Sequence, residues 1–216
     1  MTKLTDKQAI ELWERFSRGL AKDIDVDESL SRHDIEKQKE RLEKDPIAWI
    51  KYFFPSYAKY EFAPFHIKAI KRIIENDEWY EVLSWSRELA KSTTVMFCLM
   101  YLTLTKKKKF VALASATIDS AVRLLTPYRM NFEHNPRIRQ FYGKQPILGQ
   151  FTDKEFSCAC GAKFIAIGAG SAPRGMRQEA IRPDVIYLDD FDTDEDCRNP
   201  VTLDKKWDWM EKALYP

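Results

Sequence analysis

The sequence predicts an α/β fold whose mostly parallel central sheet is flanked by helices, and two observations lead to this prediction. Short apolar runs of the kind that form buried strands occur at Trp79–Trp85, Phe110–Ala114 and Asp184–Leu188. Segments with helical periodicity separate these runs, and strands that alternate with helices usually form a parallel sheet covered on both faces. A length of 216 residues with 44% hydrophobic residues suits one such domain with a helical extension.

The helical extension is predicted over residues 1–45, which are highly charged and carry apolar residues at helical spacing. Thr5 and Gln8 fit the capping box of a first helix, and a second charged helix follows the polar stretch Asp23–Asp34. The extension serves either as a lid or partner surface or as a packed addition to the domain. The domain itself is predicted over residues 46–216.

The domain begins with an aromatic stretch, Asp45–Tyr60, whose composition predicts core residues, and with a helix that Pro64 opens. A helix that is apolar nearly all round is predicted at Thr94–Leu104, and another runs from Thr117 past Leu125. The remaining elements are a hairpin of Phe151–Ser157 and Lys163–Ile167 that turns at Cys160-Gly161, and a last helix with Asn199 as N-cap and Pro200 as first residue.

Charge and cysteine content give information about the compartment and the partners of the protein rather than about its activity. A net charge of +2 neither requires nor excludes a nucleic-acid partner. No run of about 18 apolar residues predicts a membrane span, and the N-terminus lacks the apolar core of a signal peptide. Of the four cysteines only Cys158 and Cys160 are close, at a spacing that zinc sites seldom use. We expect free thiols in a reducing cytoplasm, with no membrane partner.

The segment Ser86-Arg87-Glu88-Leu89-Ala90-Lys91-Ser92-Thr93 is a candidate phosphate loop. The standard loop reads G-x-x-x-x-G-K-[ST]; Lys91 and Ser92 fill its last two positions, whereas Trp85 and Ala90 replace the glycines. A predicted strand precedes the segment and a buried helix follows it, so backbone N–H groups at the helix start would bind phosphate oxygens. Lys91 would reach the β- and γ-phosphates of ATP, and Ser92 would ligate Mg²⁺. The alternative is a chance Lys-Ser pair at a helix start.

Two acids at the end of the Asp184–Leu188 run supply the second half of the candidate site. Asp189 stands where a carboxylate would hold Mg²⁺, and Asp190 where one would orient and deprotonate an attacking water. Two acids after a strand often form only a turn, but a phosphate loop upstream favours the functional interpretation. Arg87 would contact the γ-phosphate from within the loop, or would form a structural salt bridge.

Three segments of the chain, taken in order, have a family resemblance. The first is Asp45–His66, the second is the loop around Arg87, and the third is Gly168–Asp190, which contains Arg174-Gly175 and Arg182-Pro183-Asp184. These segments resemble parts of large terminase subunits. The first resembles the segment of the family that reaches the adenine, and the second resembles its deviant Walker A motif. The third resembles the family's order of Arg-Gly, then Arg-Pro-Asp, then Walker B. These subunits are the DNA-packaging motors of tailed bacteriophages.

The resemblance implies a P-loop NTPase fold of the ASCE type that hydrolyses ATP and translocates double-stranded DNA into a procapsid. It places Phe65 and His66 at the adenine, where the family commonly has Gln; a packed helix residue is the alternative for His66. Arg174 would act near phosphate, either in its own subunit or in a neighbouring one. The implied partners are DNA, the procapsid portal, the small terminase subunit and further copies in a ring on the capsid, within the host cytoplasm.

The chain departs from the family after Walker B. The few residues that follow Asp190 contain no Ser/Thr-rich strand end of the kind that serves the family as a coupling motif. Ser115-Ala116-Thr117 has similar letters but precedes Walker B, where it would cap a helix or contact DNA. We therefore expect a truncated ATPase domain without the nuclease domain of the family.

Two other functions share these motifs. One is a helicase-like ATPase acting on nucleic acid, and the other is a nucleotide-binding interaction module without turnover, which the missing glycines favour. Lys106–Lys109 would contact DNA phosphates or form a solvated loop. The acids after Asp190 are interpreted as solvated, because their spacing does not fit a calcium loop.

Overall fold

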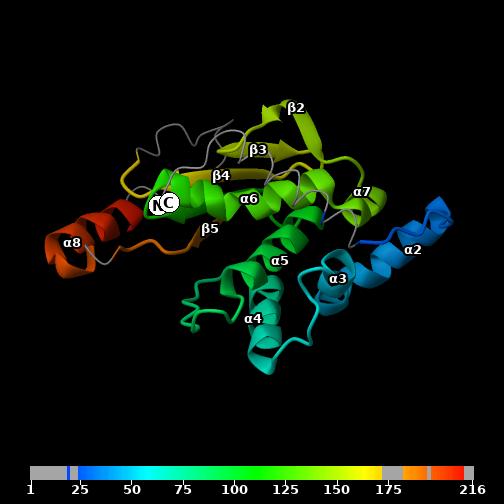
Figure 1. The fold of residues 1–216 in the computed structure, drawn as a ribbon, viewed down its shortest axis with the longest axis horizontal. Coiled ribbons are helices and arrows are strands. Elements are labelled where there is room, and N and C mark those ends of the chain that lie inside the picture. Colours follow the sequence, from blue (N-terminus) through cyan, green and yellow to red (C-terminus); the bar gives the residue numbers. More distant parts are fainter. Residues whose placement is uncertain (1–18, 20–23, 172–181, 194–195, 212–216) are drawn as a thin grey trace. The chain divides into compact units, whose positions relative to one another are not determined.

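The structure is a computed structural model that describes residues 19, 24–171, 182–193 and 196–211. Its contacts divide the chain into two compact units (Figure 1). Unit 1 comprises Met1–Tyr101 and Met130–Gln145, and unit 2 comprises Leu102–Arg129 and Pro146–Pro216. Arg174 lies outside the described residues, as does nearly all of the predicted first helix. The division predicted at residue 45 stays a prediction.

The described part of unit 1 consists of helices and their connections. These are α2 (Arg32–Glu43), α3 (Pro46–Phe53), α4 (Pro64–Glu75), α7 (Pro136–Tyr142), the first part of α5 (Lys91–Leu104) and the last part of α6 (Ile118–His134). Side chains of Ser31, Asp45 and Asn135 accept first-turn N–H bonds in α2, α3 and α7. The predicted second charged helix and the helix opened by Pro64 are confirmed, as is the buried helix, because every residue of 94–104 is buried.

An aromatic cluster forms the core of unit 1. Trp49 and Phe53 of α3 are fully buried, and the Trp49 ring centroid lies 4.8 Å from that of Phe53 and 5.2 Å from that of Tyr101. The Trp49 indole N–H donates to the Tyr142 hydroxyl at 2.8 Å, so its polar atom is satisfied within the core. The prediction of an aromatic core is confirmed for α3, whereas Tyr60 is exposed.

Unit 2 contains a five-stranded mixed sheet in the order β2-β3-β4-β1-β5 (Figure 1). Its strands are β1 (Phe110–Ser115), β2 (Pro146–Phe151), β3 (Glu155–Cys158), β4 (Lys163–Gly168) and β5 (Val185–Leu188). β1 pairs in parallel with β4 and β5, whereas β2 with β3 and β3 with β4 are antiparallel. The prediction of a mostly parallel sheet is therefore wrong, because two tight turns join β2, β3 and β4, and strands joined in this way run antiparallel.

The predicted strands were correct where the sheet supplies a hydrogen-bonding partner. Phe110–Ala114, Lys163–Ile167 and the run ending at Leu188 are strands, and the turn at Cys160-Gly161 is confirmed. Phe151 belongs to β2, a strand that the sequence did not reveal. Trp79–Trp85 is not a strand: the segment pairs with none in the described part of the chain, and Val82 within it is 75% exposed.

Helices cover both faces of the sheet. Ala112 and Ala114 of β1 share a face with Ile167 of β4, and Trp209 and Met210 pack against it from the end of α8 (Pro200–Trp209). Strand residues alternate between faces, so Phe164 lies on the opposite face, where the Tyr128 ring of α6 lies 5.5 Å away, centroid to centroid (Figure 1). The result is an α/β fold with a mixed sheet flanked by helices.

The helices of unit 2 begin as their sequences predict. The Thr117 hydroxyl accepts the Ser120 N–H at 3.1 Å, so the predicted cap is confirmed at the start of α6. Asn199 caps α8, with Pro200 as its first residue. A short 3-10 helix, η2 (Asp196–Arg198), precedes it. None of the helices in the described residues is both long and apolar enough to cross a membrane.

Candidate functional site

The candidate phosphate loop leads from an extended segment into the first turn of α5. The Leu89 N–H donates to the Ser86 carbonyl at 3.4 Å, and the Thr94 N–H to the Ala90 carbonyl at 2.8 Å, so a turn passes directly into the helix. Glu88 and Ala90 have φ angles of 69° and 54°. This left-handed backbone costs a non-glycine residue about 1 kcal/mol or more, so surrounding contacts must hold it in place.

His66 of α4 supplies such a contact. Its Nδ1 accepts the backbone N–H of Ala63 at 3.2 Å, and its Nε2 lies 2.9 Å from the carbonyl oxygen of Leu89. Because Nδ1 is an acceptor, the ring proton resides on Nε2, which donates to this carbonyl. The imidazole centroid also lies 4.1 Å from that of Phe65 and 5.2 Å from that of Trp85. His66 thereby fixes Leu89, the residue between the two left-handed positions.

Phe65 and His66 are thus brought to the phosphate loop, while their predicted role at the adenine stays a prediction. Sequence reasoning missed the part of Trp85, whose ring packs against both residues. The available signal was an aromatic residue in the first glycine position of the motif, downstream of the Phe65-His66 pair. A glycine at this position would give the backbone conformational freedom, whereas the aromatic side chain of Trp85 holds the loop by packing.

Exposure differs along the loop. Residues 86–90 are exposed, whereas Lys91, Ser92 and Thr93 are half-buried in the first turn of α5. The start of a helix favours an anion, because its N–H groups and the helix dipole point toward it. A lysine and two hydroxyls in this turn are side chains that complement a phosphate, and the exposed Arg87 adds a further positive charge nearby in the sequence.

Asp189 follows the last residue of β5 and is buried, with 8% of its surface exposed. Its Oδ2 accepts a hydrogen bond from the Tyr187 hydroxyl at 2.8 Å. Its backbone N–H donates to the Ala114 carbonyl at 3.0 Å, which extends the parallel pairing of β1 and β5 beyond the strand end. A carboxylate held by a neighbouring hydroxyl in this way has the chemistry of an oxygen ligand for a metal ion.

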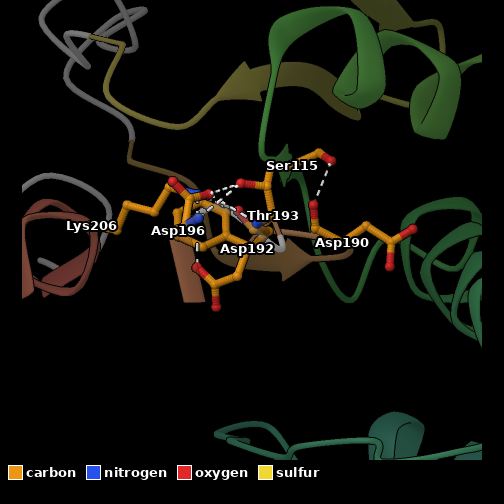
Figure 2. Close-up of polar contacts among 7 residues, drawn as sticks. Ser115, Asp190, Asp192, Thr193, Asp196 and Lys206 are labelled. Carbon is orange, nitrogen blue, oxygen red and sulfur yellow. Dashed lines mark hydrogen bonds and ion pairs between the residues drawn. The ribbon is translucent and has the colours of Figure 1, made fainter. Parts of the chain in front are cut away.

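Asp190 turns the chain at the end of the sheet. Its φ angle is 45°, and its backbone carbonyl accepts hydrogen bonds from the Ala116 N–H and the Ser115 hydroxyl, both at 3.2 Å. Its carboxylate is exposed and points away from Asp192 and Asp196 (Figure 2). The strand end therefore presents one buried acid and one exposed acid, which suits the two different roles predicted for them.

The next acids form a cluster with α8. Lys206 donates to the Phe191 carbonyl at 2.8 Å and forms an ion pair with Asp196, which also accepts the N–H and hydroxyl of Thr193 (Figure 2). The hydrogen bond from Lys206, followed by those from Thr193, lowers the pKa of Asp196 to about 2. The interpretation of the acids beyond Asp190 as solvated is wrong for Asp196, because α8 brings a lysine back to it.

The end of β4 lies close to the start of α6. A Cβ on Gly168 would lie 2.6 Å from the backbone nitrogen of Ile118, so only glycine fits without a shift of the backbone. The Ala169 N–H donates to the Ser115 carbonyl at 2.9 Å. These contacts support Ser115 from the side opposite to β5. Arg174, the predicted Arg-Gly residue, lies outside the described residues.

Asp184, from the Arg-Pro-Asp segment, aligns two strands. Its carboxylate accepts the backbone N–H groups of Lys109 at 2.7 Å and Phe110 at 2.8 Å. β1 and β5 therefore start together, and their carboxyl ends meet at Ser115 and Asp189.

The predicted site residues form one group in each unit. Unit 1 holds Phe65, His66 and residues 86–93, and unit 2 holds Asp189 and Asp190. Sequence reasoning missed Tyr187 and Ser115, which hold these two acids. The signal for Tyr187 was strand alternation, since residues two apart point to the same face; for Ser115 only the register of β1 against β5 places it there.

Each unit contains an oxygen donor of the kind that Mg²⁺ binds, Ser92 in unit 1 and Asp189 in unit 2. Within the described ranges, no group of three or more His, Cys, Asp or Glu side chains could hold a metal ion. Mg²⁺ usually needs no such cage, because it binds one or two carboxylates, waters and substrate phosphates. The buried carboxylate of Asp189 and the hydroxyl of Ser92 are donors of this kind, so the predicted set fits in its chemistry.

Comparison with known proteins found no protein-family model and no curated protein that matches the chain. The interpretation of the site therefore depends on the residues of the chain itself.

Proposed function

We propose that the chain is the ATPase part of a DNA-packaging motor of the large terminase type, with the fold of an ASCE-type P-loop NTPase. One observation supports this above all others. Glu88 and Ala90 have positive φ angles immediately before a helix that begins with Lys91. Ala90 stands at the second glycine position of the standard phosphate loop, and this chain adopts the left-handed conformation there without glycine, at a cost in free energy.

In the proposed reaction Lys91 binds the β- and γ-phosphates of ATP, and Arg87 adds positive charge where negative charge develops on the γ-phosphate. Asp190 orients the attacking water and accepts its proton. The water oxygen bonds to the γ-phosphorus while the bond to the bridging oxygen breaks, which leaves ADP and inorganic phosphate. Ser92 and Asp189 would hold Mg²⁺, which would supply positive charge to neutralise the phosphates.

The proposed work of this reaction is the translocation of double-stranded DNA into a procapsid. The proposed partners are the portal, the small terminase subunit and other copies of the chain in a ring on the capsid. In this scheme Phe65 and His66 lie near the adenine, and Arg174 acts near phosphate. An arginine supplied by a neighbouring subunit raises the rate of phosphoryl transfer by about 10³–10⁵ in known cases.

Calorimetry with Mg-ATP tests the phosphate loop. Lys91→Ala is expected to weaken binding by about tenfold or more, or about 1.4 kcal/mol, because the side chain that neutralises the phosphates is lost. Lys71→Ala, on the exposed surface of α4 in the same unit, is the matched control and should bind as the wild type does. Equal affinities for wild type and Lys91→Ala would overturn the site.

A nucleotide-binding module without turnover is the second candidate, and one observation favours it. The segment before the loop, Trp79–Trp85, is no strand, whereas the predicted phosphate loop follows a strand. Phosphate release in the presence of double-stranded DNA distinguishes the two. Release above that of Lys91→Ala supports hydrolysis, and binding without such release supports the module.

A further inference from the structure

The four cysteines of the chain are free thiols in three different settings. Cys98 is buried in α5, and Cys197 is exposed in η2. Cys158 and Cys160 lie together where β3 turns into β4. The Gly161 N–H donates to the Cys158 carbonyl at 2.9 Å, and the Cys158 N–H donates to the Ala162 carbonyl at 2.8 Å. These two backbone hydrogen bonds define the turn that contains both cysteines.

The turn brings the two thiols into contact. Cys158 and Cys160 are hydrogen-bonded to each other through their side chains. Cys158 is buried, with 1% of its surface exposed, whereas Cys160 is only partly buried. Residues at the first and third positions of a tight turn lie within the roughly 4.4–6.8 Å Cα separation that a disulfide spans. The spacing of the two residues in the turn is therefore compatible with a disulfide.

The surroundings make the two thiols chemically unequal. The hydrogen bond with Cys158 lowers the pKa of Cys160 from 9.0 to about 7, with help from the Ala162 backbone and the positive charge of Lys106. Burial raises the pKa of Cys158. Near neutral pH, a substantial fraction of Cys160 is therefore the reactive thiolate, whereas Cys158 is protonated.

We propose that Cys158 and Cys160 form an oxidation-sensitive dithiol, which hydrogen peroxide converts to an intramolecular disulfide. The Cys160 thiolate attacks the peroxide oxygen, the O–O bond breaks, and the released hydroxide takes up a proton to become water. The Cys158 sulfur then attacks the sulfenic acid on Cys160 and gives up its proton, and the hydroxyl leaves as a second water. Two thiols are oxidised and one peroxide is reduced.

This dithiol is separate from the acidic strand end. It precedes Lys163, which pairs with Phe110 at the start of β1, whereas Asp189 follows Leu188, which pairs with Ala114 near the end of β1. The two sites are therefore at opposite ends of the parallel strands, roughly 13 Å apart along β1. Its chemistry is independent of the proposed ATPase.

Peptide mass spectrometry of the whole chain after treatment with hydrogen peroxide tests the proposal. Trypsin releases residues 155–163 as one peptide containing both cysteines. This peptide is expected to lose the mass of two hydrogens and to regain it on reduction with dithiothreitol. If it keeps both thiols while Cys197, the exposed internal control, is oxidised, the dithiol does not exist as proposed.

Single variants test the order of the two steps. Cys158→Ser should stop at a sulfenic acid on Cys160 that dimedone traps, whereas Cys160→Ser should leave Cys158 unmodified because that thiol is buried. Equal reactivity of the two variants would contradict the assignment. In the Cys158→Ala variant the pH midpoint for alkylation of Cys160 by iodoacetamide should rise from about 7, and an unchanged midpoint would overturn the proposed pairing.

Discussion

The phosphate loop and the acidic strand end are held in different ways. Residues 86–90 are exposed, and His66 is the side chain that fastens them to α4. The acids instead follow a strand in register with β1, with Tyr187 and Ser115 bonded to them. A few local contacts therefore hold the loop against the free-energy cost of the left-handed backbone at Glu88 and Ala90. The acids are instead held by the packing of a sheet. Changes in the loop should alter ligand binding, and changes at the acids should alter chemistry or stability.

The largest expected effect comes from Asp190→Asn. Because asparagine cannot accept the proton of the attacking water, phosphate release should fall by about 10²–10⁴-fold while ATP affinity stays near that of the wild type. Calorimetry and a phosphate-release assay measure the two quantities separately. The control is Asp192→Asn, since Asp192 is also exposed and stands two residues away. An equal loss of rate in both variants would remove the special role of Asp190.

Gly168→Ala should come next, because it perturbs the support of the acidic end. The added Cβ meets the backbone of Ile118 at 2.6 Å, which should destabilise unit 2 by about 1–3 kcal/mol. Thermal unfolding should show a lower Tm, with little change in ATP affinity. Gly19→Ala is the control, since a Cβ there meets nothing within 4 Å. Equal Tm values for Gly168→Ala and wild type would show that the close approach does not persist.

His66→Ala tests whether His66 holds the phosphate loop in place. Loss of the hydrogen bond to Leu89 should weaken ATP binding by about tenfold, since one such bond contributes about 1 kcal/mol and the ring contacts are lost as well. His66→Gln should recover part of the affinity, because its amide N–H also donates to a carbonyl. His33→Ala, on the exposed surface of α2, should change nothing. If all three variants bind equally, His66 does not position the loop.

Asp196→Asn tests the cluster beside the acids through its pH dependence. The pKa of Asp196 is lowered from 3.8 to about 2, so its carboxylate stabilises the fold above pH 4 and loses this effect as the pH falls toward 2. The Tm of Asp196→Asn should therefore be below that of the wild type at pH 7, and the gap should narrow between pH 4 and 3. A constant gap over this range would show that Lys206 does not stabilise the charged form.

The smallest expected effect is that of Ala90→Gly. Glycine adopts the φ angle of 54° without the steric cost that alanine has, so ATP affinity should rise by about two- to fivefold. Ala159→Gly, at an exposed turn residue without a positive φ, is the control and should leave affinity unchanged. A loss of affinity in Ala90→Gly would mean that the loop binds nucleotide in another conformation.

Sequence patterns located the elements whose signals are local. Helix starts at Pro64, Thr117 and Pro200 follow from proline geometry and capping side chains, which act within one turn. β1 and β5 follow from their apolar runs, although only β1 is buried throughout, because β5 is a half-buried strand at the edge of the sheet. These signals need no knowledge of the rest of the chain.

Pairing in the sheet was beyond the reach of such signals. Trp79–Trp85 and β2 have comparable lengths, yet only β2 is a strand, because a strand exists where a neighbour accepts its hydrogen bonds. Whether two neighbouring strands are parallel or antiparallel also depends on which segments, distant in the chain, pair with each other. So does the ion pair of Asp196, since its lysine comes from α8.

By itself, therefore, the sequence determined the α/β class, the positions of most helices and the identity of the candidate loop and acids, because these depend on residues close in the chain. Only the tertiary structure decided that Ala90 takes a left-handed conformation, that His66 fastens the loop through Leu89, and that Tyr187 and Ser115 hold the acids. Apart from the hydrogen bond from Tyr187, these features depend on long-range packing or on strand register. The sequence pattern of a single segment gives no information about either.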